Sequence, residues 1–178
     1  MMTRHELAKA IYDTAHITGD FLLRSGARST EYFDKYLFES QPVLLATIAE
    51  HLVSLIPPQT EVLCGLELGG VPLATALSLR TGIPAAFVRK KAKEYGTCKI
   101  AEGSEIASKK VLIVEDVVTS GGQVVLSAQD LRIHGAEIVG AVCVIDRESG
   151  GPEALRAIDV PLHPLYTMSE LKRAGAQG

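Results

Sequence analysis

The feature of the sequence that most constrains the fold is a series of short, mostly apolar runs. They occupy Val62 to Leu66, Ala85 to Val88, Val111 to Val114 and Ile138 to Ile145. Helical patterns separate the first run from the second and the third from the fourth, and runs of this kind are typical of strands buried on both faces. Because strands that alternate with helices pair in parallel, we predict an α/β fold with a central, mostly parallel sheet flanked by helices.

Different patterns precede these runs. From Thr3 to about His16, apolar residues recur at helical intervals behind the cap residue Thr3, which predicts an amphipathic helix. Between Phe21 and Phe33 the period changes, and a turn at residues 25–27 predicts a small hairpin. The stretch from Pro42 to Leu55 predicts a second helix with proline in its first turn.

Length, charge and cysteine content limit the classes of protein. At 178 residues we expect one domain, residues 1–178. The net charge of -3 argues against nucleic-acid binding through the overall field. No leader opens the chain and no apolar run approaches the ~18 residues that span a bilayer, so we expect neither export nor membrane insertion. The cysteines, Cys64, Cys98 and Cys143, are odd in number and widely spaced, which favours a reducing cytoplasm.

Residues 111–123 read VLIVEDVVTSGGQ. An apolar strand that ends in a Thr-Ser-Gly-Gly turn and leads into a helix gathers backbone N–H groups and a positive helix end, which suits a phosphate monoester. Glycines at such junctions are also common in α/β proteins without a phosphate site. Glu115 and Asp116, however, lie where parallel sheets bind ligands, and carboxylates accept hydrogen bonds from vicinal sugar hydroxyls. The stretch therefore predicts a sugar-phosphate site.

This stretch resembles the phosphoribosyl diphosphate (PRPP) motif of the type I phosphoribosyltransferases, in which four apolar residues, two acids and two small or apolar residues precede a Thr/Ser/Gly-rich loop. The resemblance implies that the acids hold the ribose 2- and 3-hydroxyls and that the loop holds the 5-phosphate. Many members have two aspartates where this chain begins with Glu115, which leaves open whether that side chain reaches the ribose. The PRPP-binding residues implied by the motif are Glu115, Asp116, Val117, Val118, Thr119, Ser120, Gly121, Gly122 and Gln123.

A basic run, Arg89 to Lys93, follows a predicted strand and places four cations in five residues. Alone, such a run is as well explained by a solvated surface. Beside a PRPP motif it suits a leaving diphosphate, and the polar interval 90–110 predicts a mobile loop that closes over substrate.

The run RKKAKEYGT resembles the catalytic loop of the orotate phosphoribosyltransferases, which implies that Arg89 and Lys90 contact the diphosphate and that Lys93 stabilises the leaving group. Tyr95 stands where many bacterial members have histidine. The catalytic residues implied are Lys93, Arg89, Lys90 and Asp116.

Three more segments resemble the same family. FLLRSGARSTEYFDKY resembles its N-terminal signature, which implies that residues 1–40 form a hood in which Arg24 reaches the ligands and Tyr32 and Phe33 lie near the flat orotate ring. VIDRESGG resembles the segment whose arginine, here Arg147, pairs with the orotate carboxylate, and Thr119 would contact the same base. GLELGGVPLA resembles the diphosphate loop, whose residues are Glu67, Leu68, Gly69 and Gly70.

Together these segments cover about Phe21 to Gly151, and on them the chain is identified as a member of the orotate phosphoribosyltransferases. The resemblance implies transfer of ribose 5-phosphate from PRPP to N1 of orotate in pyrimidine synthesis, with Mg²⁺ carried by the diphosphate and not held directly by the protein. It also implies a homodimer with shared active sites. The alternatives are a non-enzymatic PRPP-binding regulator, for which the first 20 residues are too short to add a DNA-binding module, and a transferase for another base, which has no reason to carry the Arg147 segment.

Overall fold

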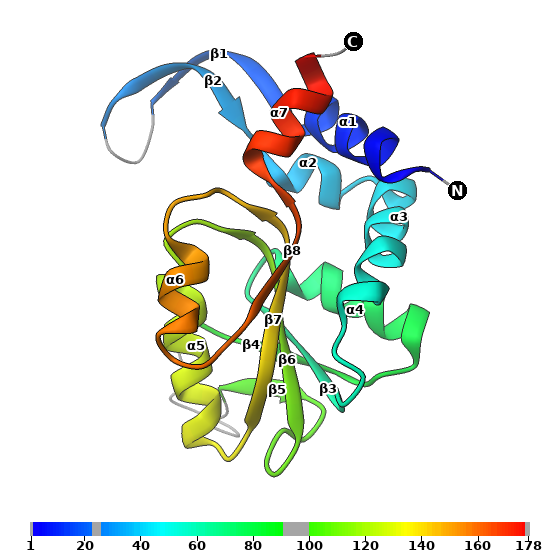
Figure 1. Cartoon of the computed structure of the whole chain (residues 1–178), viewed down its shortest axis with the longest axis vertical. Coiled ribbons are helices and arrows are strands. Elements are labelled where there is room, and N and C mark those ends of the chain that lie inside the picture. Colours follow the sequence, from blue (N-terminus) through cyan, green and yellow to red (C-terminus); the bar gives the residue numbers. More distant parts are fainter. Residues whose placement is uncertain (1, 23–25, 91–99, 177–178) are drawn as a thin grey trace.

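The computed structural model describes residues 2–22, 26–90 and 100–176. In these ranges a six-stranded sheet forms the centre of the molecule and a two-stranded hairpin projects from one end (Figure 1). The strands are β1 His16–Leu22, β2 Arg28–Phe33, β3 Val62–Leu66, β4 Ala85–Val88, β5 Ala101–Gly103, β6 Lys110–Val118, β7 Glu137–Asp146 and β8 Leu162–Thr167. The helices are α1 Arg4–Ala15, α2 Lys35–Glu39, α3 Pro42–Leu52, α4 Gly70–Thr81, α5 Gly122–Ile133, α6 Gly151–Arg156 and α7 Met168–Ala176, with a 3₁₀ turn, η1 Val53–Leu55.

The central sheet has the strand order β5-β4-β3-β6-β7-β8. All neighbouring strands are parallel except β4 and β5, which confirms the predicted mostly parallel sheet. β6 continues to Val118, so the two acids of the PRPP-like motif belong to the strand. β5 lies inside the interval 90–110, and no sequence pattern indicates it because three residues are too few to show a period.

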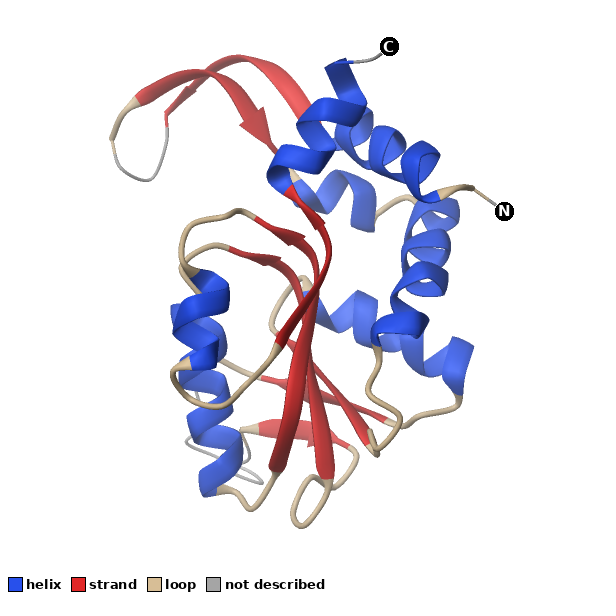
Figure 2. Cartoon of the chain, in the orientation of Figure 1, coloured by secondary structure: helices blue, strands red, loops and turns tan. Residues whose placement is uncertain are grey.

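Helices cover both faces of this sheet (Figure 2). Leu112 and Val114 of β6 pack in the cluster that includes α3 and α4, whereas Ile113 between them packs in the cluster that includes α5 and α6. Successive side chains of a strand point to opposite faces, and here both faces are buried. The strands therefore read as continuous apolar runs in the sequence.

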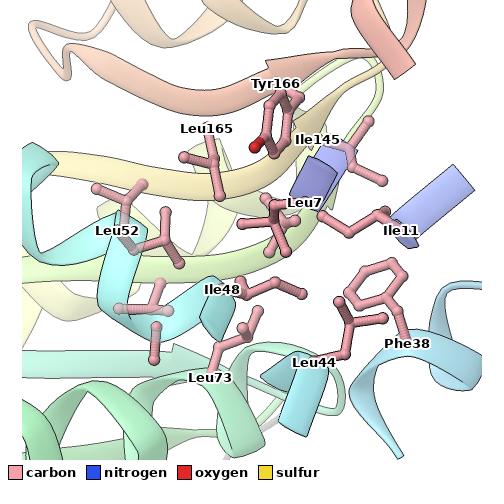
Figure 3. Close-up of a cluster of buried hydrophobic side chains, with 14 of the residues drawn as sticks. Leu7, Ile11, Phe38, Leu44, Ile48, Leu52, Leu73, Ile145, Leu165 and Tyr166 are labelled. Carbon is pink, nitrogen blue, oxygen red and sulfur yellow. The ribbon is translucent and has the colours of Figure 1, made fainter. Parts of the chain in front are cut away.

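The N-terminal helix forms where its sequence pattern predicts it. Thr3 and Glu6 form a capping box, in which each side chain accepts a hydrogen bond from the other's backbone N–H. Figure 3 shows Leu7 and Ile11 of α1 in a buried cluster with Tyr166 of β8. Burial of one such leucine or isoleucine stabilises the fold by ~1.5–3 kcal/mol. The Tyr166 hydroxyl also donates a hydrogen bond of 2.7 Å to the Arg4 carbonyl, so α1 is fastened to the sheet.

The hairpin is confirmed as well. β1 and β2 are antiparallel, with Ile17 opposite Tyr32 and Leu22 opposite Arg28. Its second strand leads through Asp34, whose carboxylate caps α2, directly into that short helix. Thus α2 connects the hairpin with α3, which precedes the main sheet.

The carboxyl ends of the parallel strands meet at one edge of the sheet. From β3 the chain crosses to β4 on one side, and from β6 it crosses to β7 on the other, so the winding direction reverses between β3 and β6. Ligands of open α/β sheets bind at such a reversal. The loops that follow β3 and β6, residues 67–69 and 119–121, lie there.

In the part of the chain that is described, no helix has the length and apolar character required to cross a membrane.

Candidate functional site

The turn after β6 has the geometry of an anion cradle. β6 ends at Val118 and α5 begins at Gly122, while Thr119 and Ser120 between them are exposed. Gly121 has φ 80°, and a Cβ there would lie 2.7 Å from Leu155 Cδ1, so both its backbone conformation and its surroundings require glycine. The free N–H groups at the start of α5 and the helix dipole favour a negative charge at this turn.

The two acids before this turn are almost completely buried. Glu115 is 8% exposed and Asp116 is 0% exposed. Because they are adjacent in a strand, their Cβ atoms leave β6 on opposite faces. The longer Glu115 side chain bends back, and its Oε1 accepts a hydrogen bond of 3.0 Å from the Asp116 N–H. The Glu115 carboxyl group therefore lies next to the backbone of Asp116.

Asp116 lies between three elements. Its Oδ1 accepts a hydrogen bond of 2.6 Å from the Val117 N–H, and its Oδ2 lies 2.5 Å from Nζ of Lys35 in α2. On the side of the 67–69 loop, an ideal Cβ built at Gly69 would overlap Oδ2 of Asp116 and lie 2.9 Å from Oε1 of Glu39. Gly69 is thus in contact with the buried carboxylate, and only a residue without a side chain fits.

These contacts separate the protonation behaviour of the acids. Burial and the charge of Asp116 raise the pKa of both Glu39 and Glu115. Burial also acts to raise the pKa of Asp116, but hydrogen bonds with Glu115, Glu39 and Lys35 outweigh it and lower that pKa. Asp116 is therefore the acid of this cluster that ionises most readily, and it lies next to the Lys35 ammonium group.

The diphosphate-loop residues lie next to the first residues of the basic run. Oε2 of Glu67 accepts a hydrogen bond of 3.1 Å from the Lys90 N–H, and Arg89 forms an ion pair of 3.8 Å with Glu102 of β5. A cavity of about 340 Å³ opens beside them, and its lining residues include Glu67, Arg89 and Glu102. Leu68 is 60% exposed. The structure therefore brings the loop 67–70 and the start of the run together, while Lys93 and Tyr95 lie outside the described residues.

A second cavity, of about 310 Å³, lies between the hairpin, α1, α7 and the loop after β7. Three residues that the sequence assigns to the base line it, namely Tyr32, Phe33 and Arg147. Thr119 lies in the exposed turn after β6, and Arg24 lies outside the described residues. An arginine beside two aromatic side chains suits a flat ligand that carries a carboxylate.

Other residues of this cavity have no counterpart in the sequence prediction. They are Tyr12, His16, Ser29, Glu31, Met168 and Lys172. Met168 and Lys172 are four residues apart in α7 and so share a helix face. The first turn of α7 is held to the loop after β7, because the Ser169 N–H donates a hydrogen bond of 2.9 Å to Glu148 Oε2. Lys172 is thus a second cation in the cavity that contains Arg147.

Lys35 and Glu39 are missed by sequence reasoning too. Their only local signal is the i, i+4 spacing behind the cap residue Asp34, a pattern that is equally typical of a solvated helix. Their contacts with Asp116 depend on packing between segments that are distant in the sequence.

Comparisons with known proteins point to one group. Residues 40–160 match the family model of the phosphoribosyl transferase domain. A protein of Nocardioides sp. named orotate phosphoribosyltransferase is 50% identical over 172 residues, which cover 97% of this chain and 96% of that protein. A second protein of that name, from Methanocella arvoryzae, is 42% identical over 167 residues, or 93% and 95% of the two chains.

Solved structures agree with these relatives. The orotate phosphoribosyltransferase of Mycobacterium tuberculosis H37Rv in complex with Fe(III) dicitrate has a TM-score of 0.86 at 32% identity, covering 94% of this chain and 98% of that one. The same enzyme in complex with PRPP has a TM-score of 0.82 at 29% identity, with 95% and 98% covered. The likeness extends over almost the whole chain.

Proposed function

This chain belongs to the orotate phosphoribosyltransferases of the phosphoribosyltransferase family, and from that premise we propose that it transfers ribose 5-phosphate from PRPP to N1 of orotate. The products are orotidine 5′-phosphate and diphosphate, in pyrimidine synthesis. The observation that carries the proposal is the meeting, at one edge of the sheet, of an anion cradle, a buried acid pair and an aromatic cavity with Arg147.

PRPP occupies the edge of the sheet in this proposal. The amides of residues 118–122 hold the 5-phosphate, which is supported by the φ of 80° at Gly121 and the start of α5 directly after it. Asp116 and Glu115 accept hydrogen bonds from the ribose hydroxyls. Since Oε1 of Glu115 already accepts the Asp116 N–H, its second oxygen is the one assigned to the ribose.

Orotate occupies the cavity between the hairpin and α7. Its planar ring lies against Tyr32 and Phe33, and its carboxylate pairs with Arg147, whose guanidinium presents two parallel N–H groups. Arg24 and Thr119 complete the base site in this proposal. Lys172 adds a second positive charge beside the carboxylate.

Departure of the diphosphate needs cationic stabilisation, because negative charge grows on it as the C1–O bond breaks. Arg89, Lys90 and Lys93 supply this charge, and the amides of residues 67–70 bind the diphosphate. The proximity of that loop to Arg89 and Lys90 supports the assignment. Mg²⁺ carried by the diphosphate would offset further negative charge. The Asp116 carboxylate is already paired with the Lys35 ammonium group, which agrees with assigning Mg²⁺ to the substrate and not to this acid.

The whole chain, residues 1–178, acts as one domain in this proposal, with residues 1–40 as the base-binding hood and residues 90–110 as the loop that serves the leaving group. We also propose a homodimer with shared active sites. Val43 of α3 and Leu79 of α4, which are 69% and 85% exposed, offer apolar surface for a second copy. A cytoplasmic location is supported by the buried free thiols of Cys64 and Cys143.

The activity is tested by mixing the protein with PRPP, Mg²⁺ and orotate and following the loss of orotate absorbance. We expect turnover with orotate and none with uracil or adenine. Turnover with another base and not with orotate would refute the assignment, and PRPP binding without turnover of any base would favour a regulator. Activity restored by mixing inactive Lys93→Ala and Asp116→Asn variants would support shared sites, and sedimentation as a monomer would contradict them.

A further inference from the structure

Helix α2 presents two charged residues to the buried acid of the PRPP-like motif. Lys35 and Glu39 are four residues apart, so they lie on one face of the helix. Nζ of Lys35 is 2.5 Å from Asp116 Oδ2, and Glu39 meets the same glycine, Gly69, that contacts this carboxylate. Both residues lie in the proposed hood, residues 1–40, but the reaction as proposed above assigns no role to either of them.

The burial of these side chains indicates a specific task. Glu39 is 8% exposed although it is ionisable, and glutamate is almost never buried without a partner. The side chain of Lys35 is 33% exposed, which leaves its ammonium group next to Asp116 without removing it from solvent completely. An exposed helix face would let both side chains extend into water. Both side chains instead lie next to the Asp116 carboxylate, because a buried charge requires partners.

The contacts of Asp116 fix the orientation of its carboxylate. A carboxylate has about four acceptor positions, two on each oxygen. On Asp116 one position of Oδ1 is used by the Val117 N–H and one position of Oδ2 by Lys35. These two contacts restrict rotation of the carboxylate about its χ2 torsion.

We propose that Lys35 and Glu39 are positioning residues that hold the Asp116 carboxylate in the orientation that accepts the ribose hydroxyls, an inference that rests on the proposed function. Lys35 supplies the compensating charge on Oδ2. Glu39 packs from the same helix, with its Oε1 beside Gly69 and next to the Asp116 carboxylate. Neither residue touches the substrate.

This arrangement predicts an effect on one substrate and not on the other. α2 follows β2, whose Tyr32 and Phe33 line the base cavity, but Lys35 and Glu39 themselves point to Asp116 and not to that cavity. Their loss should weaken PRPP binding and leave orotate binding almost unchanged. A role confined to packing would change the melting temperature and affect both substrates alike.

The experiment compares four variants of the full chain with the wild type. Lys35→Met removes the charge at constant length, and Lys35→Arg keeps it. Glu39→Ala removes the partner, and Glu39→Gln keeps a neutral group of the same shape. The matched control is Arg132→Met, because Arg132 lies in the last turn of α5, at the end away from Gly121, and donates an exposed hydrogen bond of 2.9 Å to the Ile158 carbonyl. The measurements are KM for PRPP and for orotate, kcat, PRPP affinity by calorimetry, and melting temperature.

We expect Lys35→Met and Glu39→Ala to raise KM and Kd for PRPP by ~10- to 100-fold, the range for loss of a hydrogen-bonded charged partner. KM for orotate should change less than about twofold. Lys35→Arg and Glu39→Gln should recover most of the PRPP affinity, and Arg132→Met should match the wild type.

Wild-type PRPP affinity in both Lys35→Met and Glu39→Ala would overturn the inference, and so would equal losses for both substrates that the conservative variants do not rescue. If Lys35→Met does not fold, the pair Glu39→Ala and Glu39→Gln decides by the same criteria. Failure of the proposed function is detected separately, because the wild type would then not consume orotate. Calorimetry with PRPP would still test whether Lys35 and Glu39 orient the Asp116 carboxylate for PRPP binding.

Discussion

Replacement of Gly69 by alanine adds one methyl group at the point where the loop after β3 contacts the acid of β6. The new Cβ would overlap Oδ2 of Asp116 and lie 2.9 Å from Oε1 of Glu39. Asp116 has no exposed surface into which it can move, and Lys35 and the Val117 N–H hold its two oxygens. The carboxylate or the loop must therefore shift by more than ~1 Å to restore ordinary contact.

The expected cost to folding is moderate and the cost to activity is large. Insertion of a methyl group into a packed site costs ~1–3 kcal/mol. For a chain of this size each kcal/mol lowers the melting temperature by ~2–4 °C, so we expect a decrease of ~2–12 °C for Gly69→Ala. A displacement of ~1 Å in a group that orients substrate lowers the rate by ~100-fold. The loss in kcat/KM for PRPP should therefore greatly exceed what partial unfolding explains.

The assay follows orotate consumption at saturating orotate and varied PRPP, together with thermal melting. Gly82→Ala is the control, because Gly82 has φ 76° at the end of α4 and a Cβ there would meet nothing within 4 Å. That variant loses ~1–2 kcal/mol through backbone strain alone, and its activity below the melting range should be that of the wild type. If Gly69→Ala kept kcat/KM for PRPP within about threefold of the wild type, contact between Gly69 and Asp116 would have no catalytic consequence.

Three further predictions address the leaving group, the base and stability. Lys93→Ala should lower kcat by ~100-fold or more at an unchanged melting temperature, and wild-type rates would remove this lysine from the mechanism. Arg147→Ala should raise KM for orotate by ~10- to 100-fold and leave KM for PRPP nearly constant, with Arg147→Lys recovering only part because lysine cannot bind bidentately; an unchanged KM for orotate would refute the base site. Partial burial acts to raise the pKa of Glu170, but hydrogen bonds from Thr167 and the ion pair with Arg4 outweigh it and lower that pKa. Its stabilisation is therefore complete above about pH 4.3 and is lost as the pH falls through the lower folded-state pKa. Glu170→Gln should thus melt ~1–3 °C below the wild type at pH 7, with the difference shrinking in acid, and a gap that persists in acid would contradict this reasoning.

Much of the architecture could be predicted because its causes are local. The cap at Thr3 and the helical spacing of Leu7 and Ile11 act within a few residues, and α1 forms where they indicate. The turn after Val118 is equally local, since a strand, two exposed hydroxyl residues and two glycines specify the cradle by themselves. For the same reason the resemblance of these motifs to a family could be recognised without coordinates.

Other features escaped prediction because they depend on small elements or on distant partners. β5 has three residues and exists because its backbone pairs with β4. Lys172 lies in α7, near the end of the chain, yet it enters a cavity formed mainly by the hairpin and the end of α1. His16, which is unremarkable in the sequence, lines that cavity and lies 3.5 Å from Glu31.

The buried acid shows where the two kinds of information divide. From the sequence alone, Asp116 belongs to a strand that ends at the ligand-binding edge of a parallel sheet, because period and turn composition are properties of adjacent residues. Tertiary structure alone decided that Lys35, Glu39 and Gly69 surround this carboxylate. A charge in a region without water must find its partners within a few ångströms in space, and the chain can supply them from any position in the sequence.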